Sequence, residues 1–344
     1  MLSSYEDKLN ILSFSHTELS EIVASLGEKP FRGRQIFGWL AKGVETFEEM
    51  TNLPSRLIKS LKEHYFIGLP DVEKTQKSKD GTIKCLYEFD DAVRVEAVFM
   101  KYSYGNSLCI SSQAGCKMGC TFCASTMNGL ERSLTSGEML GQVLKMVKIT
   151  GEDIRHIVVM GMGEPFDNYD ELSKFLKLIH DENGYGIGYR NITVSTCGII
   201  PAINRFAEDF PQVNLAISLH ASNDEVRRKL MPIASIYKFD DLIDVSKSYT
   251  VKTGRRITFE YSLIKGVNDS VEDAERLAKY LKGWLAHVNL IPLNKVKERK
   301  YEATGENTIR TFKEILEIRG IPVTIRRTLG NDIDAACGQL RRGR

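Results

Sequence analysis

The feature that most constrains the fold is a long alternation of strand-like and helix-like segments beyond residue 105. Apolar runs that read as buried strands are SLCISS (107–112), HIVVMGM (156–162), NITVST (191–196), VNLAISLH (213–220), ITFEYSLI (257–264), HVNLIPLN (287–294) and IPVTIRR (321–327). Helical patterns such as SGEMLGQVLKMVKIT and VEDAERLAKYLKG lie between most of them. Repeated β-then-α units with short loops indicate a parallel sheet, either doubly wound or closed as a barrel. Six or seven units over about 240 residues favour an incomplete α/β barrel.

The chain before this region has a different character. Residues 15–65 contain three short helical patterns, and 83–100 alternates like two strands across a polar DDA turn. We therefore predict a helical accessory domain over residues 1–70, a β-hairpin linker over 71–105 and the barrel over 106–344.

Composition and cysteine usage narrow the class of protein. With 42% hydrophobic and 27% charged residues, the chain resembles ordinary globular proteins. It contains no run of about 18 apolar residues and its first residues lack a signal-peptide profile, so we expect a cytoplasmic protein with no membrane partner. In that reducing compartment, an odd count of seven cysteines favours metal binding or catalysis over a disulfide framework.

Four of the seven cysteines fall in CISSQAGCKMGCTFCAS, residues 109–125. Cys116, Cys120 and Cys123 are spaced C-x3-C-x2-C in a glycine-containing loop that follows the first barrel strand. A structural zinc site would need a fourth cysteine or histidine, and no histidine lies nearby in the sequence. Three thiolates suit a cubane iron–sulfur cluster that keeps one iron open for a ligand.

Small and polar residues follow several predicted strands. In parallel α/β folds, functional residues lie at these carboxyl ends of the strands. Taken alone, each is more often a cap or a core hydrogen bond. Together they predict a ligand pocket, in which Glu164 accepts hydrogen bonds from an ammonium or hydroxyl group. The predicted pocket residues are Gly163, Glu164, Ser195, Ser218, Leu219, His220 and Asn294.

The cysteine spacing resembles that of the radical S-adenosylmethionine (SAM) superfamily. The resemblance implies a partial (β/α)6 barrel with a small helical N-terminal accessory domain. It also implies a 4Fe–4S cluster on Cys116, Cys120 and Cys123, whose open iron chelates SAM and supplies the electron that cleaves it to a 5′-deoxyadenosyl radical. GMGEP at 161–165 is similar to the SAM-binding element of that superfamily.

Two cysteines far apart in the sequence narrow the resemblance to one family within this superfamily. Cys109 with the cysteine loop, GMGEP, ISLHA, HVNLIPLN and GNDIDAACGQL around Cys337 together resemble the RlmN/Cfr family of radical SAM RNA methyltransferases. Within it, the N-terminal FRGRQIFGWL and Pro165 are similar to the RlmN branch. That branch methylates carbon 2 of an adenosine in 23S ribosomal RNA, with adenosine 37 of transfer RNA as a second candidate substrate.

The family mechanism, carried over onto these positions, uses two SAM molecules per turnover. Cys337 takes a methyl group from the first SAM, and the radical formed from the second SAM abstracts hydrogen from that group. The carbon radical then adds to adenine. Cys109 releases the product by forming a Cys109–Cys337 disulfide, which external reduction resets. Glu96 matches the proposed proton acceptor, although its place in VRVEAVFM also fits the exposed face of an alternating strand.

Two other readings stay open at this point. One is Cfr-type methylation of carbon 8 of the same adenosine, which gives resistance to ribosome-targeting antibiotics. The other is a non-enzymatic RNA-binding or zinc-stabilised protein. We further expect a monomer, and an electron donor such as flavodoxin or ferredoxin. The basic runs at 295–300 and 341–344, with Arg326 and Arg327, are either solvated surface or contacts to RNA phosphates.

Overall fold

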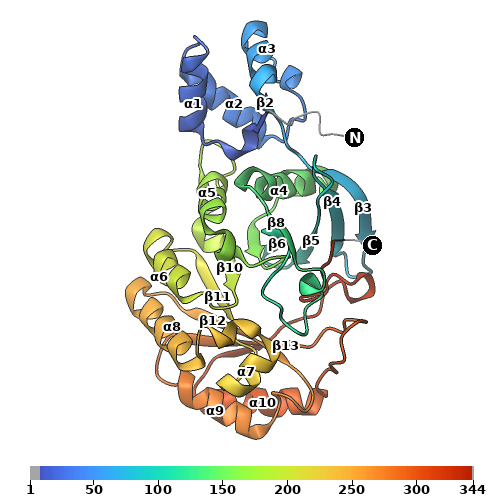
Figure 1. Cartoon of the computed structure of the whole chain (residues 1–344), viewed down its shortest axis with the longest axis vertical. Helices are drawn as coiled ribbons and strands as arrows, with labels where there is room; N and C mark the ends of the chain where they lie inside the picture. The colour runs from blue at the N-terminus through green and yellow to red at the C-terminus, as the bar shows by residue number, and fades with distance from the viewer. Residues whose placement is uncertain (1–7, 343–344) are drawn as a thin grey trace.

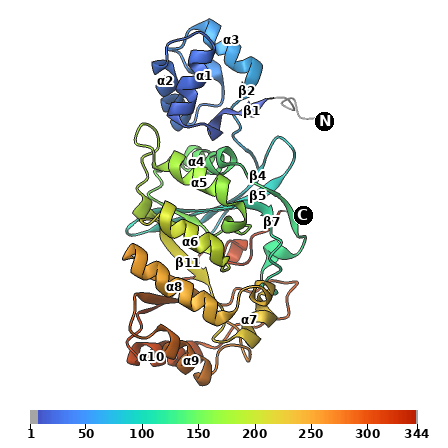
Figure 2. The same cartoon turned by 60° about the vertical axis from the view of Figure 1, so that its left-hand side comes forward.

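The computed structural model describes residues 8–342. Its amino-terminal part is a small helical unit at one end of the molecule (Figures 1 and 2), built from α1 (His16–Ser25), α2 (Phe31–Ala41) and α3 (Ser55–His64). Helix α1 begins at a capping box in which Ser15 and Glu18 satisfy each other's backbone N–H groups. This unit is the helical accessory part that the sequence predicts, although residues 1–7 of the predicted 1–70 domain lie outside the described residues.

One mixed sheet forms the centre of the molecule. In spatial order its ten strands within residues 8–342 are β14 (Val323–Ile325), β13 (Ala286–Pro292), β12 (Ile257–Leu263), β11 (Asn214–Ser218), β10 (Ile192–Thr196), β9 (His156–Val159), β6 (Gly105–Ile110), β5 (Arg94–Tyr102), β4 (Ile83–Glu88) and β3 (Asp71–Lys77). The strands from β6 to β14 pair in parallel, and β3, β4 and β5 extend the β6 edge in antiparallel pairing.

Helices connect the parallel strands and cover the outer face of the sheet (Figure 1). They are α4 (Ser136–Thr150), α5 (Tyr169–His180), α6 (Ile200–Asp209), α7 (Asp224–Leu230), α8 (Phe239–Thr253), α9 (Val271–Leu281) and α10 (Glu306–Ile318). The order gives six β-then-α units followed by β14, in the described part of the chain. This confirms the predicted partial (β/α)6 barrel.

The accessory unit is tied to the barrel through its first residues. The short helix η1 (Ile11–Ser13) packs on α4, and Ser13 Oγ accepts a hydrogen bond from the Gly137 N–H at 3.1 Å. A side chain at position 137 would clash, because a Cβ there would lie 2.5 Å from Ser13 Oγ. The domain boundaries at residues 70 and 105 stay predictions.

After β14 the chain returns across β4 and β5, so that residues 326–341 form a carboxyl-terminal segment beside these strands (Figure 1). Lys84 Nζ donates to the Asp334 carbonyl at 3.0 Å, and the Gly330 N–H donates to Asp80 Oδ2 at 2.8 Å. Residues 343–344 of the predicted basic run lie outside the described part. No helix within residues 8–342 has the length and apolar character needed to cross a bilayer.

Candidate active site

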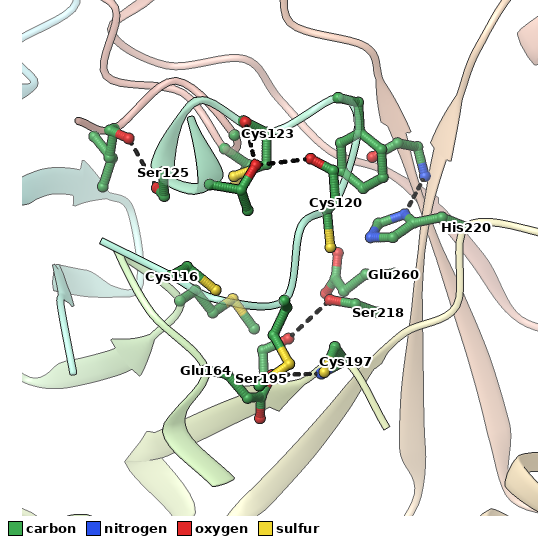
Figure 3. A pocket seen from close by; sticks show the side chains of 18 of the residues that line it. Cys116, Cys120, Cys123, Ser125, Glu164, Ser195, Cys197, Ser218, His220 and Glu260 are labelled. Carbon is green, nitrogen blue, oxygen red and sulfur yellow. Dashed lines mark hydrogen bonds between the residues drawn. The ribbon is translucent and has the colours of Figure 1, made fainter. Parts of the chain in front are cut away.

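A cavity of about 150 Å³ lies at the carboxyl ends of the parallel strands. Figure 3 shows Cys116, Cys120 and Cys123 along one side of it, with Glu164, Ser195, Ser218 and His220 facing them. Gly163, Asn294 and Cys337 also line it. The structure therefore brings most of the predicted site residues around one space.

The three cysteines sit in a loop between the short strands β7 (Gln113–Gly115) and β8 (Leu130–Ser133), which pair in antiparallel fashion. Gly115 has φ +79°, and a Cβ there would lie 2.0 Å from the Gly129 carbonyl, so this turn requires glycine. The Cys116 N–H donates to that same carbonyl at 3.1 Å. The glycines noted in the sequence thus fold the loop sharply enough to aim its sulfur atoms into the cavity.

One residue of the basic run 295–300 supports this loop. Arg299 Nη2 donates to the Cys123 carbonyl and to Thr126 Oγ1, each at 2.9 Å. The expectation that the whole run is either solvated surface or RNA contacts is therefore wrong for Arg299, which turns inward. Lys295, Lys297 and Lys300 are exposed, as expected.

The three cysteine side chains that line the cavity suit an iron–sulfur cluster. Within residues 8–342, no three His, Cys, Asp or Glu side chains are placed to hold one metal ion. A cubane spreads its thiolates over separate irons, so its ligands need not converge on one point. Burial raises the pKa of Cys116 to about 12 and also raises that of Cys120 and Cys123. The positive charge of a bound metal cluster stabilises the thiolate form of these buried cysteines.

The opposite wall comes from the ends of β9, β10 and β11. Ser195 Oγ and Ser218 Oγ lie 3.4 Å apart. Glu164 is buried, and its two oxygens accept the Cys197 N–H at 2.7 Å and the Phe166 N–H at 3.0 Å. Each oxygen keeps a further lone pair for a ligand. Burial raises the pKa of Glu164, and these N–H groups oppose that rise.

His220 is held as a neutral ring. Its Nδ1 accepts the Ser262 N–H at 2.9 Å, which leaves the proton of the neutral ring on Nε2. Burial, with Arg227 nearby, lowers the pKa of His220 to about 3. The residue has φ +52°, a conformation that non-glycine residues seldom adopt outside sites with a special demand. Its neighbour Leu219 is fully buried in the core and does not line the cavity.

Cys337 joins this cavity to a second one of about 40 Å³, which Cys109 also lines. Asn294 Nδ2 donates to the Cys337 carbonyl at 3.1 Å and so holds the segment in place. Burial raises the pKa of Cys109 to about 12, and the nearby Cys337 adds to the rise. All seven cysteines are free thiols.

Glu96 lies outside the lining of these two cavities. Its carboxylate pairs with Lys84 at 2.9 Å and accepts the Arg341 N–H at 2.8 Å, and both side chains of the pair are almost fully buried. The alternating pattern suggests that Glu96 lies on an exposed strand face. That prediction is wrong, because the carboxyl-terminal segment covers this face.

Two charged residues of the cavity were not predicted as site residues from the sequence. Glu260, in the middle of β12, lines the cavity and accepts a hydrogen bond from Asn289 Nδ2 at 2.9 Å. Arg326 lies 3.5 Å from Glu260 Oε2 and lines both cavities. No motif marks Glu260, whereas Arg326 was noted only as part of a basic pair.

Comparisons with known proteins agree with this geometry. Residues 110–281 match the family model of the radical SAM superfamily, and residues 9–67 match that of the ribosomal RNA large subunit methyltransferase N-terminal domain. Two relatives are named "Probable dual-specificity RNA methyltransferase RlmN". The one from Alkaliphilus oremlandii is 53% identical, covering 98% of each chain. The one from Clostridium tetani is 50% identical, covering 97% of this chain and 96% of the relative.

Solved structures give the same answer for the fold. A radical SAM methyltransferase from Sphaerobacter thermophilus superposes with a TM-score of 0.94 at 42% identity, covering 97% of this chain and all of that one. The match includes both the accessory unit and the barrel, since it spans nearly every residue. The chain belongs to the RlmN family of radical SAM RNA methyltransferases.

Proposed function

We propose that this chain methylates carbon 2 of an adenosine in 23S ribosomal RNA through a methyl group carried on Cys337, with adenosine 37 of transfer RNA as a second substrate. The observation that carries the proposal is the position of Cys337, which lines both the cysteine-loop cavity and the small cavity that contains Cys109. The "dual-specificity" name of the relatives supports the two classes of RNA substrate.

Cys116, Cys120 and Cys123 would hold a 4Fe–4S cluster, and SAM would occupy the rest of the same cavity. Its polar groups would contact the residues that line the opposite wall, which are Gly163, Glu164, Ser195, Ser218, His220 and Asn294. When bound, the cluster and SAM supply the methyl group and the radical chemistry that an unactivated adenine C–H bond demands. Leu219 stays a predicted part of the SAM site, with its side chain buried in the core and outside the lining of the cavity.

The thiols of Cys337 and Cys109 have different roles in the reaction. Cys337 holds the methyl group as a thioether, within reach of both cavities. After addition to adenine, the adduct loses one electron and the proton of the ring carbon, which restores the aromatic ring. Cys109, once it has lost its own proton, then attacks the Cys337 sulfur; an S–S bond forms, the electron pair of the broken sulfur–carbon bond goes to the transferred carbon, and a proton added there completes the methyl group of the released RNA. An external reductant that supplies two electrons and two protons returns both cysteines to thiols, and an electron donor such as flavodoxin or ferredoxin supplies the electron for the radical chemistry.

Glu96 stays a predicted proton acceptor for the ring carbon. Its contacts favour a second role, because the carboxylate joins Lys84 to the backbone of Arg341 and so holds the carboxyl-terminal segment that carries Cys337. A buried carboxylate in this position stabilises the segment only while its charge is paired.

Nucleoside mass spectrometry tests the proposal. The reconstituted chain, with SAM and a reductant, is expected to form 2-methyladenosine in a 23S ribosomal RNA fragment and in transfer RNA. Cys337→Ala should form none, whereas Cys85→Ala, which removes a buried thiol in β4 outside both cavities, should retain activity. Formation of 8-methyladenosine would assign the chain to the alternative chemistry, and 2-methyladenosine from Cys337→Ala would exclude the cysteine-borne methyl group.

A further inference from the structure

A third and larger cavity, of about 730 Å³, opens at the opposite end of the barrel. Its walls come from the first residues of the parallel strands, such as Thr193, Asn214, Thr258 and Thr324. In parallel strands alternate side chains face the same side, so the inward face that carries Ser195 and Ser218 at one end carries Thr193 and Asn214 at the other. The cavity is therefore the amino-terminal mouth of the barrel interior.

The mouth is strongly basic. Its lining contains Arg255, Arg256, Arg326 and Arg327, against Glu260 as the one carboxylate in the part of the chain that the structure describes. Arg256 and Arg327 are exposed, and neither forms an ion pair within residues 8–342. Unpaired guanidinium groups around a hollow attract a polyanion, and they bind phosphate oxygens in a bidentate fashion.

Two aromatic rings stand at the same mouth. Tyr104 lies in the turn between β5 and β6 with 63% of its surface exposed. Its ring stacks on that of Tyr102, with centroids 4.9 Å apart and planes 11° from parallel, and meets His156 edge-on at 5.3 Å. One face of an ordered ring is thus held in place while much of the side chain faces solvent. Such exposed aromatic platforms stack the unpaired bases of single-stranded RNA.

The mouth connects to the reactive thiols. Met100, Tyr102, Met160, Arg326 and Arg327 line both this cavity and the small one that holds Cys109 and Cys337. Glu260, Met160 and Arg326 also line the cysteine-loop cavity. A base that enters from the mouth therefore reaches Cys337 past Tyr102 and Arg326, from the side opposite the cysteine loop.

We infer that the amino-terminal mouth of the barrel is the docking site for single-stranded RNA next to the target adenosine. Tyr104 stacks one flanking base, and Arg256 and Arg327 bind the phosphates on either side. The target base itself passes inward to Cys337. This inference rests on the proposed function and adds to it the surface that receives the substrate.

Fluorescence anisotropy tests the inference with a labelled RNA hairpin whose single-stranded loop contains adenosines. Tyr104→Ala is expected to weaken binding about tenfold, whereas Tyr104→Phe keeps the ring and should bind like the wild type. Arg256→Glu with Arg327→Glu should weaken binding further, and should reduce the slope of log affinity against log salt by about one for each arginine. Arg310→Glu, an exposed arginine on α10 outside the mouth, is the matched control and should bind normally.

A second readout separates the docking site from the chemistry. Peptide mass spectrometry of the loaded enzyme without RNA should show the methyl group on Cys337 in wild type, Tyr104→Ala and the double arginine variant alike. If the mouth variants bind the hairpin normally and the wild type methylates RNA, the docking site is overturned and the proposed function still stands. Loss of Cys337 methylation in Tyr104→Ala would also overturn it, because the residue would then act on the thiol site. A wild type that neither binds nor methylates RNA overturns the proposed function and the docking site together.

Discussion

The cysteine loop and the carboxyl-terminal segment supply the two halves of the same site, yet they differ in how they are built. Loop residues 115–126 combine bonds close in the sequence, such as Thr126 Oγ1 to the Cys120 carbonyl, with distant ones, such as the Thr121 N–H to the Leu230 carbonyl. The carboxyl-terminal segment is held from far away in the sequence, since Lys84 reaches across 250 positions to the Asp334 carbonyl. The spacing of the loop cysteines is local, whereas the segment depends on distant anchors as well as on turns of its own, such as the bond from the Ala335 N–H to the Gly330 carbonyl.

The supports of the two halves are largely distinct, but the halves also contact each other. Arg299 and Thr121 tie the loop to the rest of the barrel, whereas Lys84, Glu96 and Asn294 hold the segment. Between the halves, the Ala124 N–H donates to the Gly338 carbonyl and Ser125 Oγ donates to the Leu340 carbonyl, each at 2.8 Å. A change in the support of one half should therefore act mainly on that half, and its effect on the other half should be confined to the residues that make these contacts.

The largest effect is expected from the loop. Cys116→Ala removes one of three thiols that line the cavity and should abolish RNA methylation together with most of the bound iron. Because Lys84 and Asp80, which anchor residues 330–335, do not bond to the cysteine loop, hydrogen exchange in residues 330–335 should match that of the wild type. Iron and sulfide analysis with amide exchange measures both. Full iron content in this variant would contradict the assignment of Cys116 as a ligand.

A smaller effect is expected from the support of the segment. Lys84→Met leaves Glu96 buried without its partner, which should lower the free energy of unfolding by about 3 kcal/mol. It should also speed hydrogen exchange in residues 330–341 and slow RNA methylation, while the iron content stays normal. Chemical denaturation, amide exchange and iron analysis measure these quantities, and unchanged exchange in the segment would refute its anchoring by Lys84.

Glu96→Gln is the companion variant, because an amide oxygen still accepts the Arg341 N–H, and the buried Lys84 ammonium loses its charge partner but keeps its bond to the Asp334 carbonyl. If Glu96 only anchors the segment, Glu96→Gln should lose less RNA methylation activity than Lys84→Met does. Loss of RNA product with a normally methylated Cys337 and a normally ordered segment would instead support the proton-acceptor role.

The contrast also explains what the sequence could reveal. The strand-and-helix alternation predicted the parallel barrel because each buried strand and amphipathic helix carries its own periodicity. The loop cysteines were predictable because their spacing is local. Cys337 and Cys109 were singled out only through resemblance to a family, since no spacing rule links residues 228 positions apart.

Other features depend on contacts that no local pattern encodes. Glu96 alternates like an exposed residue but is buried, because a segment from the chain end covers its strand. Arg299 lies in a basic run, yet its guanidinium bonds to the cysteine loop. The basic mouth combines arginines that precede β12 with others that follow β14, so it exists only once the strands are placed side by side.

Peptide mass spectrometry of Cys337 tests the central claim most directly. After incubation of the loaded chain with isotopically labelled SAM and reductant but no RNA, the Cys337 peptide should gain one labelled methyl group, and the Cys109 peptide should gain none. Added RNA should then carry that label into 2-methyladenosine. An unmodified Cys337 in enzyme that methylates RNA, or a methyl group found on Cys109 instead, would contradict the account.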